Sequence, residues 1–397
     1  MRILLVLPSS TYRASDFLDA ARAVGAEVVV ASEEEQLLTE RFVLIDICNP
    51  RTSAEQIVER GIQVDAVVGV DEQGVLFAAH LAALLDLPHN PPRAVATTRD
   101  KALTRIVLTD AGLDQPAHRL VHDDQFRKAA SSVGYPCVVK AVDLAASRGV
   151  IRANTPEELD EAASRVRAIV GEDVPLLVES YVPGAEVAVE GLLSEGKLQV
   201  LAIFDKPDPL EGPFFEETIY VTPSRLDRKT LDRITAAIAR ACTAIGLVEG
   251  PIHAEARITE DSVVVLEVAA RSIGGLCSRA LRFGAGISLE EVIVRHALRL
   301  DAGDLRRSKG ASGVMMVPVP ATGTLRSVDG LDGARSVDGV SGVEITVPLG
   351  QAIEAWPEGD RYLGFIFATD DTAAQVEAAL RDAASKLQVR IEPVAAD

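Results

Sequence analysis

Short apolar runs alternate with amphipathic stretches along the first ninety residues. The runs "ILLVL", "EVVVAS", "RFVLIDI" and "DAVVGV" are typical of buried strands, and "SDFLDAARAVG" has the spacing of a helix ended by Gly25. This alternation predicts a parallel sheet with helices on both faces. The first strand is followed by "PSSTYR", so the G-x-G-x-x-G fingerprint is absent, and with it the main reason to expect NAD.

The pattern changes twice further along the chain. The stretch "LPHNPPRAVATTRDK" contains three prolines and marks a first boundary, after which short strands such as "CVVKAV" and "LQVLAIF" interleave with helices. From about Lys309 the runs "GVMMVPVP", "GVEITVPLG" and "RYLGFIFAT" precede a closing helix, "TAAQVEAALRDAASKL". We therefore expect three domains, covering residues 1–96, 97–305 and 306–397.

Composition and charge narrow the class of partner. The 397 residues are 48% apolar and 25% charged, as in an ordinary globular protein, and the formal net charge is -19. That charge argues against a nucleic-acid partner but leaves room for a small phosphorylated ligand in a local pocket. The start, "MRILLVLPSS", has an apolar run too short for a signal-peptide core or a membrane span, so no membrane partner is expected.

The cysteines are far apart in the sequence, and no pair has the spacing of a metal or redox site. Each lies among apolar or small residues, which predicts buried free thiols and fits a reducing cytoplasm. They are Cys48, Cys137, Cys242 and Cys277.

One predicted hairpin places two acids opposite each other. In "HAEARITEDSVVVLEVAARSIGG" the runs "AEARI" and "VVVLEV" are strands around a polar turn. In the simplest tight register residues 260–262 form the loop and Thr259 pairs with Val263. Counting back, Glu255 then pairs with Glu267 on the same face, where two carboxylates repel. A magnesium ion would hold them there, whereas a slipped register would leave a solvated edge hairpin.

Two further segments end strands with charged residues. "GYPCVVKAVDLAASRGV" places Lys140 at a strand end before a loop of small residues that could meet phosphate oxygens, although the Walker spacing is missing. In "LLVESYVPGAEVAVEG" Glu179 ends one strand and Glu186 opens the next. Carboxylates at such places can accept hydrogen bonds from an adenine amino group or ribose hydroxyls. Solvated surface charges are the alternative for all three residues.

Taken in order, five segments resemble the ATP-grasp carboxylate–amine ligases: "RDKALTR", "YPCVVK", "VESYVPGAEVAVEG", "GPIHAEARI" and "LEVAARSIGG". The resemblance covers roughly residues 1 to 300. The tail, from "ASGVMMVPVPATGTL" onward, is similar to the C-terminal domain of the L-amino-acid ligase branch, which makes dipeptides and includes carnosine-synthase-like enzymes. The resemblance implies an α/β fold with a Rossmann-like N-terminal domain, an ATP-grasp domain of two α+β lobes and a small C-terminal α+β domain.

The resemblance also assigns ATP as co-substrate and Mg²⁺ or Mn²⁺ as cofactor. Glu255 and Glu267 become the metal ligands, and Ala269 stands where many members carry Asn, so water would complete the metal shell. The two lysines and the loop of residues 147–149 would hold the phosphates. Glu179 would face adenine, and Glu186 would face the ribose. The residues so assigned to ATP are Lys101, Lys140, Ser147, Arg148, Gly149, Glu179, Ser180, Tyr181, Val182 and Glu186.

Substrate contacts are expected from two segments. Arg271, four residues after the second metal ligand, is the candidate to bind the acyl phosphate or a substrate carboxylate, because its planar fork suits bidentate anion contacts. A structural salt bridge is the alternative. Glu217 matches an acid that lies near the substrate in related ligases, although strand alternation leaves Glu216 open. Tyr220 stands where His is common.

Small residues follow the arginine. Gly274 and Gly275 leave room for an acyl group. His253 precedes the first metal ligand by two positions and shares its face, so it either supports that ligand or is a buried, hydrogen-bonded histidine.

These features together predict a ligase that activates an amino-acid or related carboxylate as an acyl phosphate, joins it to an amine and releases ADP and phosphate. The partners are then small-molecule acids and amines, and a homodimer is left open. Two alternatives are a purine-biosynthetic or carboxylase-type ATP-grasp enzyme and a non-catalytic ATP-binding protein. The sequence does not name the acid or the amine.

Overall fold

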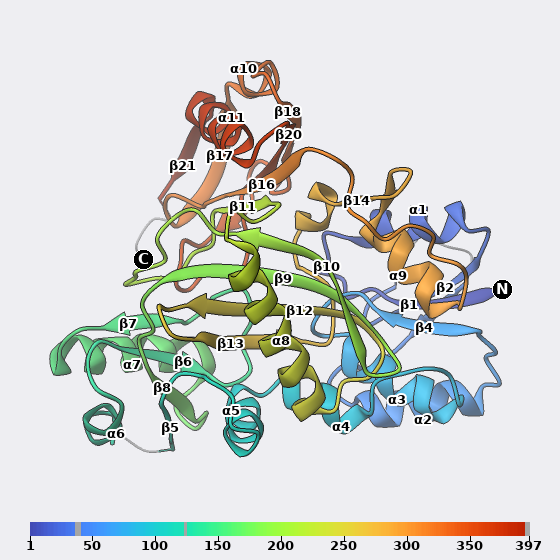
Figure 1. The fold of residues 1–397 in the computed structure, drawn as a ribbon, viewed down its shortest axis with the longest axis horizontal. Coiled ribbons are helices and arrows are strands. Elements are labelled where there is room, and N and C mark those ends of the chain that lie inside the picture. The colour runs from blue at the N-terminus through green and yellow to red at the C-terminus, as the bar shows by residue number, and fades with distance from the viewer. Residues whose placement is uncertain (36–40, 123–124, 394–397) are drawn as a thin grey trace.

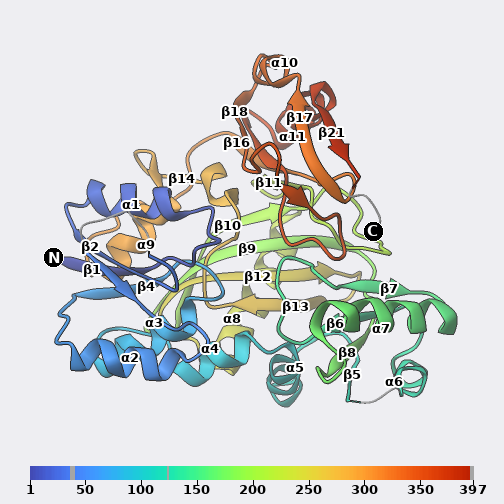
Figure 2. The same cartoon turned by 180° about the vertical axis from the view of Figure 1, so that it is seen from behind.

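The N-terminal part of the protein is a parallel sheet between two layers of helices, as predicted. The computed structural model describes residues 1–35, 41–122 and 125–393. Its first four strands pair in parallel in the order β3-β2-β1-β4. Figures 1 and 2 show α1 and α9 on one face and α2 and α3 on the other. The elements are β1 (Arg2–Val6), α1 (Ala14–Ala23), β2 (Glu27–Ser32), β3 (Phe42–Leu44), α2 (Pro50–Glu59), β4 (Ala66–Gly69), α3 (Val75–Leu84) and α9 (Leu289–Ala297).

Alternation along β1 explains both layers. Ile3 and Leu5 join a core with Phe17 of α1, whereas Leu4 and Val6 join a second core with α2 and α3. Successive strand residues point to opposite faces, so a continuous apolar run such as "ILLV" needs cover on both sides.

A small antiparallel lobe follows, with strand order β5-β8-β6-β7. Its helices α6 and α7 pack on the sheet in one core. Thr155 caps α7 by accepting a hydrogen bond from the backbone N–H of Glu158 at 3.2 Å. The elements from the first domain to the end of this lobe are α4 (Pro92–Thr98), α5 (Lys101–Asp110), β5 (His118–Val121), α6 (Phe126–Val133), β6 (Cys137–Ala141), β7 (Ile151–Ala153), α7 (Pro156–Val170) and β8 (Leu176–Ser180).

An eight-stranded antiparallel sheet forms the centre of the molecule, in the order β13-β12-β9-β10-β11-β16-β20-β18. Strand β11 precedes residue 305 and strand β16 follows it, and the two pair within this sheet. The domain boundary predicted at residue 305 therefore does not separate two sheets. The strands and the helix α8 that packs on them are β9 (Ala185–Ser194), β10 (Lys197–Asp205), β11 (Ile219–Thr222), α8 (Arg228–Ile245), β12 (Gly250–Ile258), β13 (Val263–Ala269), β16 (Ala311–Val317), β18 (Val340–Ile345) and β20 (Gly364–Asp370).

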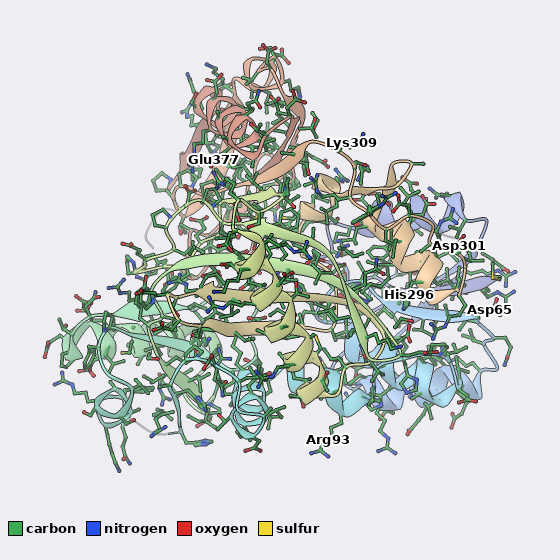
Figure 3. The ribbon with its side chains drawn as sticks, viewed as in Figure 1. Asp65, Arg93, His296, Asp301, Lys309 and Glu377 are labelled. Atoms are coloured by element: carbon green, nitrogen blue, oxygen red, sulfur yellow. The ribbon has the colours of Figure 1, made fainter. Side chains whose placement is uncertain are left out.

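The C-terminal part adds a layer on the far end of this sheet. Lys309, just before β16, and Glu377, on α11, mark it in Figure 3. The helix α11 packs in a core with strands β16 and β20. The remaining elements are η1 (Cys277–Ala280), β14 (Arg282–Phe283), β15 (Ile287–Ser288), β17 (Gly323–Asp329), α10 (Leu331–Arg335), β19 (Ala352–Ile353), α11 (Ala373–Lys386) and β21 (Gln388–Glu392).

The β12–β13 hairpin corrects the predicted turn and keeps the predicted pair. Ile258, not Thr259, pairs with Val263, so the predicted three-residue loop was wrong and the loop has four residues. A β-bulge in β13 then adds one residue between the turn and the acids. Glu255 is therefore opposite Glu267, as expected.

One cysteine differs from expectation. Cys48 is exposed, because it lies in the turn before α2, where its backbone N–H donates to Asp46. The other three cysteines are buried, and all four are free thiols. In the part of the chain that the structure describes, no helix is long and apolar enough to cross a membrane.

Candidate active site

A cavity of about 700 Å³ lies where the N-terminal sheet, the small lobe, the central sheet and the C-terminal part meet. Of the site residues predicted from the sequence, Gly149 does not line it. This glycine has φ +64°, and a Cβ there would lie 3.5 Å from the side chains of Ile169 and Leu144. The predicted residues on its wall are Lys101, Lys140, Ser147, Arg148, Glu179, Ser180, Tyr181, Val182, Glu186, Glu217, Glu255, Glu267, Arg271, Gly274 and Gly275.

The central sheet packs one face under α8 and presents several charged residues on the other. On β12 the small residues Ala254 and Ala256 join the core under α8, so His253, Glu255 and Arg257 point the other way. The same alternation on β9 buries valines toward α8 and directs Glu186 and Glu190 to the charged side. Glu186, Glu190 and Glu255 therefore project from the same face of the central sheet.

Glu179 is held between two cations. Its carboxylate accepts from Arg105 Nε at 2.6 Å and meets Lys140 Nζ at 2.6 Å. Burial opposes its ionisation, but the charges of Arg105 and Lys140 outweigh this and lower the pKa of Glu179 to about 2. Sequence reasoning missed Arg105, although it lies four residues after Lys101 and hence on the same face of α5.

The loop after β6 is tied to the C-terminal part of the chain. Ala146 and Ser147 have positive φ, at +56° and +55°. The Trp356 indole donates to the backbone oxygen of Ala146 at 3.2 Å, and Arg148 Nε donates to that of Glu358 at 2.9 Å. The loop expected to cover phosphates thus depends on a segment that follows it by about two hundred residues.

The two hairpin acids fit a divalent cation. Both line the cavity, and their carboxylate oxygens are the hard ligands that Mg²⁺ and Mn²⁺ prefer. Glu255 is partly covered, while Glu267 is more open, with Lys101 Nζ at 3.7 Å from its Oε2. This lysine also donates to the backbone oxygen of Leu144. A phosphate bound at Lys101 would lie beside the two acids.

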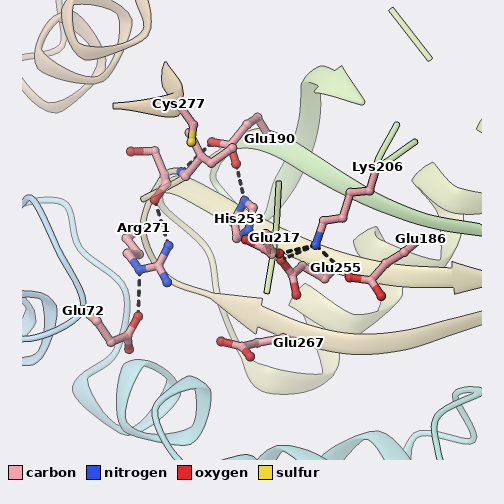
Figure 4. A network of polar contacts seen from close by, with 12 residues as sticks. Glu72, Glu186, Glu190, Lys206, Glu217, His253, Glu255, Glu267, Arg271 and Cys277 are labelled. Atoms are coloured by element: carbon pink, nitrogen blue, oxygen red, sulfur yellow. Dashed lines mark hydrogen bonds and ion pairs between the residues drawn. The ribbon is translucent and has the colours of Figure 1, made fainter. Parts of the chain in front are cut away.

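Lys206 was missed by the sequence reasoning and lies at the centre of an acid cluster (Figure 4). Its Nζ is 2.7 Å from Glu186 Oε1 and 2.8 Å from Glu255 Oε1, and it also contacts Glu217 Oε1. Lys206 follows β10 opposite Glu186, whose other strand neighbour is Arg257. The signal that could have identified Lys206 is this row of opposite charges across three strands. It can be recognised only when the register of the strands is known.

His253 is both buried and close to a metal-ligand candidate. Its Nδ1 is 2.5 Å from Glu190 Oε1, and its Nε2 is 3.4 Å from Glu255 Oε1. Burial lowers the pKa of His253, but Glu190 and then Glu255 outweigh it and raise that pKa to about 9. Glu190 also accepts from the backbone N–H of Ile273 at 3.0 Å, which links the hairpin to the loop after Arg271.

Arg271 takes part in the salt bridge that the sequence left open as an alternative. Its Nε donates to Glu72 Oε2 at 2.9 Å, and its Nη1 donates to the backbone oxygen of Ser272 at 3.0 Å (Figure 4). Glu72 comes from the N-terminal domain, in "DEQG" after β4, and was also missed. The guanidinium lines the cavity, so this bridge orients it at the wall.

Aromatic residues line the cavity besides the predicted residues: Tyr12, Phe215, Tyr220, Tyr362 and Phe365. Glu217 lines the cavity, whereas Glu216 does not. A side chain at Gly274 would meet open space. At Gly275, with φ +57°, a Cβ would lie 2.9 Å from the ring of Phe365. The expected room is therefore present at Gly274, while Gly275 allows Phe365 to approach the loop.

Comparison with known families assigns three regions of the chain. Residues 18–89 match the ATP-grasp N-terminal domain, residues 133–280 the ATP-grasp domain, and residues 315–392 the L-amino acid ligase C-terminal domain 2.

Known relatives agree with these assignments. The crystal structure of an L-amino acid ligase from Bacillus licheniformis is similar over 98% of both chains, with a TM-score of 0.84 and 26% identity. An alanine–anticapsin ligase from Bacillus subtilis is 27% identical over 55% of this chain and 52% of its own length. Carnosine synthase 1 from Gallus gallus is 28% identical over 66% of this chain and 31% of its own length. The chain thus spans about half of the first of these two enzymes and about a third of the second.

Proposed function

Because the chain belongs to the ATP-grasp carboxylate–amine ligases and carries the C-terminal domain of the L-amino acid ligases, we propose that it forms an amide through an acyl phosphate. The acid is an amino acid or a related carboxylic acid. The observation that carries the proposal is one cavity whose wall holds two facing carboxylates, two lysines and an arginine: Glu255, Glu267, Lys101, Lys140 and Arg271.

ATP is expected to lie between the small lobe and the central sheet. Lys101 and Lys140 neutralise its phosphates, and Ser147 and Arg148 close over them. Adenine lies against the strand end that includes Glu179. Each carboxylate oxygen has two lone pairs, so the pairing of Glu179 with two cations is compatible with a further hydrogen bond from the adenine amino group. The other residues proposed for the nucleoside are Ser180, Tyr181, Val182 and Glu186.

A divalent cation fits at Glu255 and Glu267, and when bound it neutralises charge on the transferred phosphoryl group. Lys101, 3.7 Å from Glu267, adds a second positive charge on the same side. Ala269 provides no ligand atom, so water would complete the shell.

The proposed reaction has two steps. A substrate carboxylate oxygen bonds to the terminal phosphorus while the bond to the bridging oxygen of ADP breaks. The amine nitrogen then bonds to the acyl carbon, phosphate leaves and the amine loses a proton. Arg271 binds the acyl phosphate or the carboxylate, since its fork can donate two parallel hydrogen bonds to an anion. Glu217 faces the incoming amine.

Phosphate release across a panel of amino-acid pairs tests this proposal. We expect release that requires Mg²⁺, ATP, one acid and one amine, with a product whose mass is their sum less one water. ATP binding without turnover across the panel would contradict it in favour of the non-catalytic alternative. Bicarbonate-dependent ADP formation would instead favour a carboxylase-type enzyme.

A further inference from the structure

Lys206 has a place that the proposed reaction does not use. It follows β10, its side chain is 3% exposed, and its ammonium group meets three carboxylates: those of Glu186, Glu217 and Glu255. An ammonium group has three N–H donors, so these three acceptors use all of them. The three contacts fix the orientation of the lysine head group from three different strands or loops.

Lys206 lies across the strands from Glu186, so its side chain is on the same face of the sheet as the acids, where it is almost fully buried. All three acids line the cavity, whereas Lys206 is not among the described residues on its wall. Substrates entering the cavity therefore meet the carboxylates and not the ammonium group. The opposite side of Glu186 is held by Arg257 Nε at 2.8 Å from Oε2, which completes a buried row of alternating charges.

Without the lysine, the cluster has the geometry of a metal site. One oxygen from each of the three acids lies within 4.8 Å of the others, and carboxylate oxygens are hard ligands for divalent cations. Three carboxylates this close repel strongly in a partly buried setting unless a cation lies among them. In the structure that cation is the ammonium of Lys206.

We propose that Lys206 is a positioning residue, the protein's own cation in this cluster, which holds Glu217 and Glu255 in place and keeps a divalent metal out. The metal is then directed to Glu255 and Glu267, beside the phosphate-binding lysines. The parts played by Glu217 and Glu255 rest on the proposed ligase function. The exclusion of metal from the cluster does not, because it depends on charge and geometry alone.

Manganese binding without nucleotide tests the proposal directly. Lys206→Met keeps the length of the side chain and removes its charge. We expect this variant to bind one more Mn²⁺ per chain than the parent, measured by the electron paramagnetic resonance of free Mn²⁺. Adding Glu186→Gln to it should abolish the extra site. Lys229→Met, which removes an exposed lysine of α8, is the matched control and should bind as the parent does.

Kinetics supply the second readout. Loss of charge-assisted contacts to Glu217 should raise the KM for the amine by at least about tenfold in Lys206→Met, with a smaller change in the KM for ATP. Lys206→Arg retains the charge, so it should gain no Mn²⁺ site and should recover most of the amine affinity. These expectations separate a charge effect from a general loss of packing.

Two results would overturn the proposal. The first is a folded Lys206→Met that binds Mn²⁺ and amine as the parent does. The second is a folded Lys206→Arg that gains the Mn²⁺ site, or whose KM for the amine rises about tenfold or more. This second result decides the matter if Lys206→Met does not fold. If the parent has no ligase turnover but Lys206→Met still gains the Mn²⁺ site, the proposed function is contradicted. The role of Lys206 in the cluster is then supported.

Discussion

Arg271 and Glu72 form an ion pair of 2.9 Å that joins the loop after β13 to the N-terminal domain. The side chains are 11% and 18% exposed, so solvent screens the contact only in part. Arg99 Nε lies 3.7 Å from the other oxygen of Glu72. An acid from one domain therefore orients the arginine that we propose for anion binding in another.

Replacing Glu72 tests that orientation. In Glu72→Gln the charge-assisted hydrogen bond is lost, which is worth about 1.5–3 kcal/mol in typical proteins. We expect kcat/KM for the acid substrate to fall roughly 10- to 100-fold, and the unfolding free energy to fall by no more than about 3 kcal/mol. Steady-state kinetics measure this, with Glu55→Gln in the exposed Arg51–Glu55 pair of α2 as control. Parental constants in Glu72→Gln would show that Arg271 does not depend on its partner.

Replacing Glu267 tests the metal assignment. Glu267→Gln should abolish turnover and leave the fold intact, because removing one of two facing carboxylates relieves repulsion. The unliganded protein should be as stable as the parent or slightly more so, and the increase in Tm on adding Mg-ATP should shrink. Calorimetry and activity assays measure both. Glu260→Gln, in the exposed turn of the same hairpin, is the control. Equal turnover in Glu267→Gln and the parent would remove the assignment.

The hairpin also shows what the sequence could and could not predict. Strand residues two apart share a face, so Val265 and Glu267 would both point toward α8 in a regular strand. The bulge changes this, so that Val265 and Val268 are buried under α8 while Glu267 lines the cavity. The sequence predicted the correct acid pair with a wrong turn, because the shorter loop and the missing bulge cancel.

Contacts between distant segments were beyond sequence reasoning. The domain order and the apolar faces follow from local patterns, and the structure confirms the α/β architecture. The partners Glu72 and Lys206 depend on which loops meet across domains and on the register of the central sheet. A single sequence contains no local signal for either.

The loop over the proposed phosphate site should respond to nucleotide. Limited trypsin digestion should cut after Arg148 without Mg-ATP, and more slowly with it, because such loops become ordered on closure. Trp356→Phe removes the indole donor to Ala146 and should speed this cleavage in the absence of nucleotide. Cleavage after the exposed Arg60, at the end of α2, serves as the internal control. The same rate at Arg148 in both conditions would contradict a closing loop.

A buried ion pair links the residue before α1 to the helix α9. Arg13 and Glu290 are 2.9 Å apart, with side chains 0% and 2% exposed. Glu290→Gln leaves a buried arginine uncompensated and should cost about 3–5 kcal/mol of unfolding free energy. Urea unfolding measures this loss. Asp19→Asn, in the exposed Asp19–Arg22 pair, should cost less than about 1 kcal/mol. A similarly small loss in Glu290→Gln would contradict the account.

The same pair predicts a pH dependence. Burial opposes ionisation of Glu290, but Arg13 outweighs it, so the pKa of Glu290 is lower in the folded protein than its ordinary value of 4.5. The contribution of the pair to stability is therefore fully present above that ordinary value and is lost as the pH falls through the folded pKa. The difference in unfolding free energy between the parent and Glu290→Gln should shrink on acidification. A difference that stays constant or grows would contradict this sign.

The fate of one oxygen atom tests the central claim most directly. If a substrate carboxylate is activated as an acyl phosphate, one of its oxygens must leave with the phosphate. With the acid and amine that give the fastest phosphate release, a carboxylate labelled with heavy oxygen should yield labelled phosphate, an amide and ADP, as mass spectrometry and nucleotide analysis can determine. Unlabelled phosphate formed alongside the amide, or AMP with pyrophosphate, would contradict the account.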